Sequence, residues 1–154
     1  MMKLDAIDRR ILAALQRDGR LSNVDLAREV GLSPSPCLRR VRLLEEAGVI
    51  ERYVALLNPE QVGFAMSLFV RVWLDGQDEE TVQRFIAAVE RLEAVVECHL
   101  MGGDCDFLLR VVAADLNAYR RFQAEHLARI DGVRSLKTDI PMQRVKLTSA
   151  LPVA

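Results

Sequence analysis

The sequence predicts an α+β protein in which an N-terminal winged helix-turn-helix precedes a C-terminal ferredoxin-like βαββαβ domain. Two observations lead to this prediction. Up to about residue 50, apolar side chains recur at helical spacing, whereas beyond residue 66 short runs rich in β-branched residues alternate with amphipathic helices. We expect a helical domain over residues 1–57, a linker over 58–65 and a second domain over 66–154.

The first helix is indicated by apolar residues that repeat at helical spacing: Leu4, Ile7, Ile11, Leu12 and Leu15. Asp5 and Asp8 favour its positive N-terminal end, and we expect it to end near Arg17. A second helix follows, with Ser22 as its N-cap and Gly31 as the left-handed residue after its end.

The third helix begins at Ser33-Pro34, because proline at the first helical position lacks only an N–H that the helix does not use. Spacing predicts a buried face formed by Cys37, Val41 and Leu44, with Ser35, Arg39 and Arg42 roughly opposite. This is the layout of a helix-turn-helix, whose second helix enters the major groove of DNA. The alternative is an ordinary helical hairpin whose arginines form a solvated face.

The overall charge does not favour nucleic acid, because the formal net charge of the chain is −1. DNA binding therefore has to depend on the local cluster Arg39-Arg40-Arg42, and on two copies of it acting together.

The end of the helical domain is marked by a change of pattern. Ala47-Gly48 ends the third helix, and residues 53–57 read as a short apolar strand of the kind that forms a wing. Asn58-Pro59 then marks the domain boundary, with one helical turn expected at Glu60, Gln61 and Val62.

The second domain is predicted to alternate strands and helices in the order βαββαβ. We expect strands at 67–74, 94–101, 106–112 and 133–140, a short fifth strand at 144–148, and helices at 78–92 and 116–130. Large apolar residues occupy both faces of the first strand, where Phe69 and Trp73 alternate with Val70 and Val72. An uncovered apolar sheet face usually marks an interface, so we expect a homodimer formed through the sheet.

Catalytic and metal chemistry find little support in the sequence. Cys98 and His99 are adjacent on a strand and point to opposite faces, and neither they nor Cys105 have the spacing of metal ligands. No nucleophile–base set, phosphate loop or pair of catalytic carboxylates is apparent. We expect no enzymatic activity, no metal and no cofactor.

The cellular compartment is indicated by what the sequence lacks. No apolar run is long enough to span a membrane, and MMKLDAIDRR has no apolar core of a signal peptide. Three cysteines at scattered positions suit a reducing compartment. We expect a cytoplasmic, nucleoid-associated protein.

The turn between the second and third strands can hold a small zwitterion. Gly102-Gly103 can present backbone N–H groups to a carboxylate, while Asp104 and Asp106 can hold an ammonium group. The alternative is a plain turn that needs glycine for its backbone angles and aspartate for its cap.

Two stretches together resemble a known family: LDAIDRRILAALQRDGRLSNVDLAREVGLSPSPCLRRVRLLEEAGVI and ECHLMGGDCDFLLRVVAADLNAYRRF. They are similar to the Lrp/AsnC (feast/famine) transcription regulators, most of all to the leucine-responsive branch, and the likeness runs from Leu4 to Thr148. The resemblance implies a sequence-specific regulator of amino-acid metabolism that binds double-stranded DNA, forms dimers, assembles to octamers or larger, and is modulated by an amino acid held at the hairpin loop.

Carried over by position, the resemblance implies a DNA-facing set of Ser35, Pro36, Arg39, Arg40 and Arg42. It likewise implies an effector site of Met101, Gly102, Gly103, Asp104 and Asp106. Met101 replaces the small hydroxyl residue that many members have, so we expect leucine, isoleucine, methionine or cysteine as effector in preference to a charged amino acid. The alternative function is an amino-acid-sensing oligomer whose helical domain binds protein instead of DNA.

Overall fold

The computed structural model describes residues 2–153, which divide into two compact units. The helical unit consists of the chain up to Leu56 together with the tail from Val145, and the sheet unit consists of Leu57–Arg144. These units differ from the predicted division, which places residues up to 154 in the second domain. The difference lies in the tail.

The tail belongs to the helical unit because its backbone bonds to the first helix. The side-chain amide of Gln16 accepts the N–H of Leu151 at 2.6 Å and donates to the carbonyl oxygen of the same residue at 3.0 Å. Val153 packs against the helical core. Consequently the chain passes between the two units twice, once after Leu56 and once before Val145.

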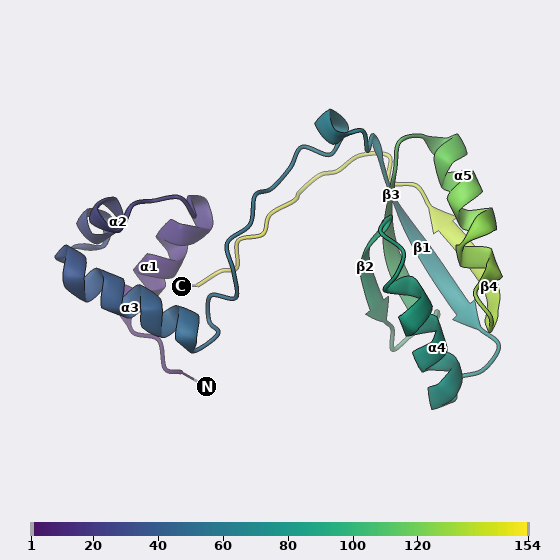
Figure 1. Ribbon diagram of the computed structural model, residues 1–154, viewed down its shortest axis with the longest axis horizontal. Helices are drawn as coiled ribbons and strands as arrows, with labels where there is room; N and C mark the ends of the chain where they lie inside the picture. Colours follow the sequence, from purple (N-terminus) through teal and green to yellow (C-terminus); the bar gives the residue numbers. More distant parts are fainter. Residues whose placement is uncertain (1, 154) are drawn as a thin grey trace. The chain divides into compact units, whose positions relative to one another are not determined.

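Three helices form the helical unit: α1 (Ala6–Arg17), α2 (Asn23–Val30) and α3 (Pro34–Glu46) (Figure 1). The predicted boundaries are confirmed. Ser22 caps α2 by accepting the N–H of Asp25, and Gly31 ends it with a left-handed φ of 77°. Ser33 is the N-cap residue of α3, although its hydroxyl makes no capping hydrogen bond.

The strand predicted at 53–57 does not form. This segment is extended, and within the described part of the chain it pairs with no other strand. The Tyr53 hydroxyl donates to the Glu45 carboxylate at 3.0 Å, which anchors the segment to the end of α3. Val54 and Leu56 stay exposed. A strand needs a neighbour to satisfy its backbone N–H and C=O groups, and within residues 2–153 no segment pairs with this one. The fifth strand expected at 144–148 is absent for the same reason.

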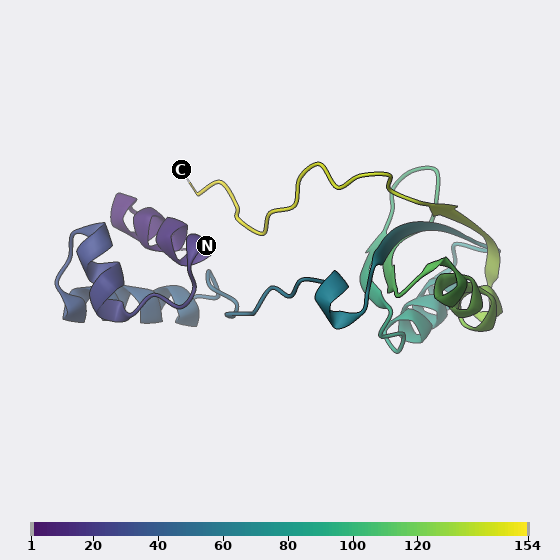
Figure 2. The same cartoon turned by 90° about the horizontal axis from the view of Figure 1, so that it is seen from above.

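The sheet unit has the predicted βαββαβ order. Its elements are η1 (Glu60–Val62), β1 (Met66–Leu74), α4 (Glu79–Val89), β2 (Val95–Leu100), β3 (Phe107–Ala113), α5 (Leu116–Glu125), η2 (Leu127–Arg129) and β4 (Val133–Asp139). The strands are antiparallel in the order β2-β3-β1-β4. Figure 2 shows α4 and α5 on the same side of the sheet. The turn expected at 60–62 is present as η1.

The two faces of the sheet differ in cover. On β1, Leu68, Val70, Val72 and Leu74 are buried, whereas the residues between them, including Phe69 and Trp73, remain partly exposed. The buried side chains pack with Phe85 and Phe107, whose ring centroids lie 4.5 Å apart. The other face is more polar than the sequence pattern of β1 indicates, because Arg71 pairs with Asp139 at 2.7 Å and Arg110 with Glu97 at 2.8 Å.

No helix among the described residues is long and apolar enough to cross a bilayer.

Candidate nucleic-acid interface and ligand loop

Burial determines which face of α3 is free. Cys37 and Leu44 have no exposed surface and point into the helical core. The residues on the exposed side of α3 line a surface hollow of about 260 Å³: Ser35, Leu38, Arg39, Arg42, Leu43 and Glu46. Three of the five residues predicted from the resemblance to face DNA, Ser35, Arg39 and Arg42, therefore lie together. Pro36 is exposed in the first turn.

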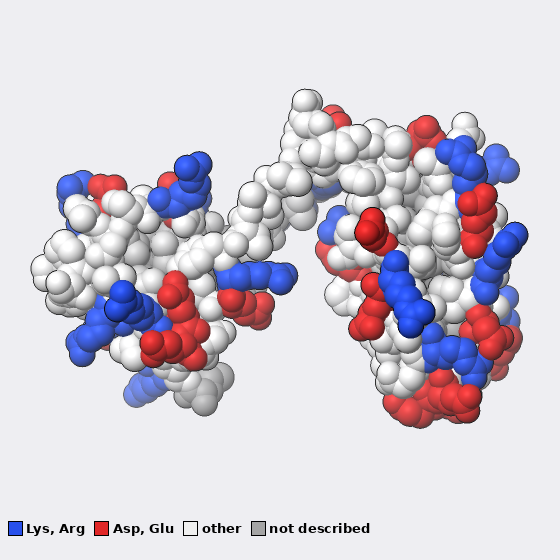
Figure 3. Space-filling model, viewed as in Figure 1, with Lys and Arg blue, Asp and Glu red and all other residues white. Residues whose placement is uncertain are grey.

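Charge is distributed unevenly along α3. Figure 3 shows basic side chains over its first part and acidic side chains over its last part. Arg39 and Arg42 stand in the middle of the helix, whereas Glu45 and Glu46 occupy its last turn. The charges therefore favour a polyanion along the first and middle parts of α3 over its acidic last turn, and the positive dipole end at the N-terminus acts in the same direction.

The start of α3 is held by a residue that the sequence analysis did not single out. Asn23, the first residue of α2, donates its side-chain amide N–H to the carbonyl oxygen of Pro34 at 2.8 Å. This bond ties the beginnings of the two helices together. Its only sequence signal is an asparagine next to an N-cap serine, which is common at helix starts and specifies no distant partner.

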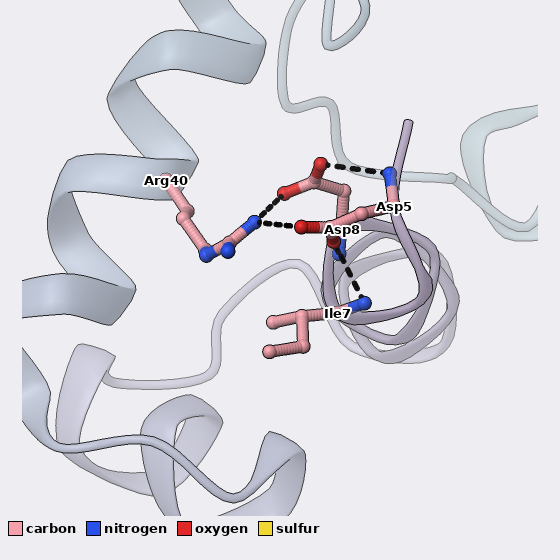
Figure 4. Close-up of polar contacts among 4 residues, drawn as sticks. All are labelled: Asp5, Ile7, Asp8 and Arg40. Carbon is pink, nitrogen blue, oxygen red and sulfur yellow. Dashed lines mark hydrogen bonds and ion pairs between the residues drawn. The ribbon is translucent and has the colours of Figure 1, made fainter. Parts of the chain in front are cut away.

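Arg40 differs from Arg39 and Arg42 because its guanidinium group forms ion pairs within the chain. Its guanidinium Nη1 lies 2.8 Å from Oδ2 of Asp5 and 2.7 Å from Oδ1 of Asp8, both in or beside the first turn of α1 (Figure 4). The backbone N–H of Asp8 and the Arg40 guanidinium lower the pKa of Asp5 below its ordinary value. The structure thus brings Arg40 to α1, and away from the hollow that Arg39 and Arg42 line.

The candidate ligand loop between β2 and β3, residues 101–106, is tied to the end of β1. The Trp73 indole N–H donates to the carbonyl oxygen of Asp104 at 2.6 Å. The Asp106 carboxylate accepts the backbone N–H of Leu74 at 2.7 Å and the side-chain N–H of Gln77 at 2.8 Å. The resemblance implies an effector role for Asp106, but in this structure its carboxylate is occupied by β1 and the residues that follow. Asp104 is exposed, and its carboxylate has no partner among the described residues.

Trp73 and Gln77 were missed by the sequence analysis as parts of this loop. Their separation along the chain from residues 101–106 hides a contact that arises only because β1 lies beside β3. The sequence pattern placed Trp73 on the sheet face expected to form a dimer, and an isolated glutamine carries no signal.

The two loop glycines are under no internal constraint. Positive φ values occur at Gly31, Gly48, Gly63 and Gly132, not at Gly102 or Gly103. A Cβ atom built on Gly102 or Gly103 meets nothing within 4 Å. The alternative of a turn that needs glycine for its backbone angles is therefore not supported, and an anion site here would have to use the N–H groups of a turn without a left-handed residue. Among the described residues, their N–H groups find no acceptor.

The cysteines and histidines of this region do not assemble into a metal site. Within residues 2–153, no group of three or more His, Cys, Asp or Glu side chains could hold a metal ion. Cys98 is exposed, and partial desolvation by its surroundings, followed by the nearby Glu90 carboxylate, raises the pKa of its thiol, which disfavours the nucleophilic thiolate form.

Two family profiles match the chain. A winged helix-turn-helix DNA-binding profile matches residues 4–51, and the Lrp/AsnC ligand binding domain matches residues 67–151. Fold and site together define a class: a DNA-binding transcriptional regulator in which a helix-turn-helix is joined to a ligand-binding domain of the amino-acid-sensing type. The chain belongs to the Lrp/AsnC family.

Relatives of known name and structure support this assignment along nearly the whole chain. The chain is 46% identical to the leucine-responsive regulatory protein of Salmonella typhimurium, over 97% of this chain and 92% of that protein. It resembles the crystal structure of a transcriptional regulator from Neisseria meningitidis in complex with L-Met, with a TM-score of 0.94, 38% identity, and coverage of 98% of this chain and 97% of the other. An AsnC family regulator from Agrobacterium tumefaciens gives a TM-score of 0.92 at 41% identity, with 97% of both chains covered.

Proposed function

We propose that this regulator places the exposed face of α3 in the major groove of its operator. The observation that carries the proposal is that Ser35, Arg39 and Arg42 share one exposed face. Arg39 and Arg42 form no ion pair with any described residue, so their guanidinium groups are free for base edges or phosphates. Pro36 is exposed in the first turn of the same helix, the part of a recognition helix that lies closest to the base edges.

A salt-dependent gel shift with the DNA upstream of the protein's own gene tests this proposal. Arg39→Ala is expected to weaken binding by about 1–3 kcal/mol if Arg39 contacts a base edge. Arg91→Ala, which removes an exposed arginine from the sheet unit, is the matched control. The alternative function, in which the helical unit binds protein, predicts no specific shift with wild type at any salt concentration.

We propose further that the loop of residues 101–106 binds an amino acid. The unpaired Asp104 carboxylate would hold its ammonium group, the free N–H groups of Gly102 and Gly103 its carboxylate, and Met101, which is 39% exposed, would contact an apolar side chain. Asp106 would hold the loop in place through its hydrogen bonds to Leu74 and Gln77. The L-Met bound in the Neisseria meningitidis relative is consistent with this chemistry.

The effector is proposed to be methionine, leucine, isoleucine or cysteine. Calorimetry of the full chain against all twenty amino acids tests it. Binding of an apolar or sulfur-containing member supports the proposal, whereas a lysine or glutamate hit would show that other groups line the site.

Assembly completes the proposal. The uncovered sheet face, with Phe69 and Trp73 partly exposed, would be covered by a second subunit, and dimers would assemble to octamers or larger. Sedimentation velocity should show a dimer or larger assembly, and Phe69→Asp should shift it toward monomer.

We further propose that the protein acts at the nucleoid in the cytoplasm and has no enzymatic activity, as its relatives are transcriptional regulators.

A further inference from the structure

The contact between α3 and the start of α1 is built around a buried charge. Asp8 is 4% exposed and is the one buried charged side chain among residues 2–153. Its Oδ2 atom accepts the backbone N–H of Asp5 at 3.1 Å, completing a capping box, and its Oδ1 atom accepts from Arg40. A buried carboxylate is costly unless it is paired and hydrogen-bonded, so Arg40 is a required partner here.

The same guanidinium group reaches both aspartates. One nitrogen, Nη1, lies within 2.8 Å of an oxygen from each of Asp5 and Asp8 (Figure 4). Arg40 is itself partly buried, whereas Arg39 and Arg42 are exposed. Its charge is therefore largely offset by α1, and little of it remains to attract phosphate.

The position of Arg40 on the helix gives this contact a directional consequence. Successive residues of an α-helix differ by 100°, so Arg40 lies on a flank between the buried Cys37 and the exposed Arg39. A contact on the flank resists rotation of α3 about its own axis. The apolar contacts of the buried face resist this rotation less, because they have no preferred direction. Rotation would move Arg39 and Arg42 away from the base edges that they have to reach, and recognition requires placement to within about 0.5 Å.

We propose that Arg40 is a positioning residue for DNA recognition, which acts through Asp5 and Asp8 and not through contact with DNA. The proposal rests on the proposed function of α3 and deepens it. It assigns to Asp5 and Asp8, on a different helix, a part in operator recognition.

The competing possibility is that Arg40 leaves the aspartates and binds a phosphate. The two possibilities predict opposite signs for Asp8→Asn. This variant keeps an oxygen to accept the Asp5 N–H but loses the charge that pairs with Arg40. If Arg40 positions α3, Asp8→Asn weakens operator binding, whereas if Arg40 binds phosphate, Asp8→Asn releases it and strengthens binding.

The test measures the affinity of the full chain for two duplexes, the protein's own upstream region and a scrambled duplex of the same length and composition. Each is measured over a range of salt concentrations. Arg40→Ala and Asp8→Asn should each reduce the ratio of specific to non-specific affinity by about fivefold, a common size for coupling between neighbouring side chains. The dependence of affinity on salt concentration should stay as in wild type. The double variant, Arg40→Ala with Asp8→Asn, should bind the operator no more weakly than the weaker-binding of the two single variants.

Three results would overturn the inference: an unchanged specificity ratio in Arg40→Ala, a tighter Asp8→Asn complex, or a loss of about 0.9 in salt slope per lost phosphate contact. General instability is distinguished because a smaller folded fraction lowers both affinities equally and leaves their ratio unchanged. Asp5→Asn, which keeps a good N-cap residue, provides a milder variant if Asp8→Asn does not fold. Asp25→Asn removes an equal charge from α2 as a control.

Failure of the proposed function gives a different result. In that case wild type itself shows no preference for its upstream region over the scrambled duplex. Wild-type preference together with an unchanged ratio in Arg40→Ala would refute only the positioning role.

Discussion

Trp73 and Asp104 are joined by one hydrogen bond, in which the indole N–H at the end of β1 donates to the carbonyl oxygen of the ligand loop at 2.6 Å. Trp73 is the single tryptophan of the sequence. The intrinsic tryptophan fluorescence of this protein therefore reports on the loop that we propose as the effector site.

Addition of L-methionine is expected to change the Trp73 emission, because a ligand at residues 101–106 alters the environment of the indole group. Trp73→Phe removes the signal and the hydrogen bond, and should weaken effector binding by about 0.5–1.5 kcal/mol, measured by calorimetry. Calorimetric binding without any change in wild-type emission would place the ligand elsewhere.

Asp104 and Asp106 are expected to respond differently to alanine. Asp106→Ala leaves the Leu74 N–H without its acceptor and should lower the free energy of unfolding by about 1–3 kcal/mol. Asp104→Ala removes an exposed, unpaired carboxylate, so stability should stay within about 0.5 kcal/mol. Its effector binding should nevertheless weaken by about 1.5–3 kcal/mol, the range for a charged hydrogen bond. Urea unfolding and calorimetry on the same samples measure both. Equal destabilisation by the two variants would contradict the assignment.

Glycine substitutions separate a structural from a binding role. Gly31→Ala should cost about 1–2 kcal/mol of stability, because its φ of 77° is left-handed. Gly102→Ala and Gly103→Ala should leave stability within about 0.5 kcal/mol, since an added Cβ meets no atom of this chain. Weaker L-methionine binding in either loop variant would show that a ligand approaches the backbone closely there. A melting temperature of either loop variant well below that of wild type would show instead that the fold itself requires glycine at that position.

The tail is expected to be held by Gln16. In Gln16→Ala the Leu151 N–H loses its acceptor, so hydrogen exchange at that amide should accelerate, and stability should fall by about 0.5–1.5 kcal/mol. Gln83→Ala, which removes only a contact to Glu79 within α4, serves as the control. Exchange at Leu151 as slow in Gln16→Ala as in wild type would mean that Val153 alone holds the tail.

Acid is expected to weaken both the N-cap of α1 and its contact with α3, because the backbone N–H of Asp8 and, after it, the Arg40 guanidinium lower the pKa of Asp5. The folded-state pKa of Asp5 lies below its ordinary value of 3.8, so the stability that this carboxylate contributes is present above that value and is lost as the pH falls through the lower folded-state pKa. The difference in melting temperature between wild type and Asp5→Asn should thus narrow as the pH falls below about 4. A difference that stays constant between pH 7 and 3 would contradict the ionic origin of the contact.

The sequence by itself determined the helices and the four strands of the sheet in their order, but not the strands expected at 53–57 and 144–148, which are absent. Caps such as Ser22, the left-handed Gly31 and the spacing of Cys37, Val41 and Leu44 are local features, and local backbone preferences decide where helices begin and end. The alternation along β1 likewise divided its residues between two faces, and the structure shows that the face with Val70 and Val72 is the buried one. These features alone place Ser35, Arg39 and Arg42 roughly opposite the buried stripe of α3, where the structure has them.

Tertiary structure alone decided what the charged and polar side chains contact. Arg40 and Arg39 are neighbours in the sequence, yet one pairs with α1 and the other lines the open face. Asp106 turns to the end of β1, and Gln16 holds the tail more than a hundred residues away. These partners are distant in sequence, and a long side chain can reach several of them. Only the packing of one element against another selects which contact forms, whereas the pattern of apolar burial is already written in the spacing of residues along each element.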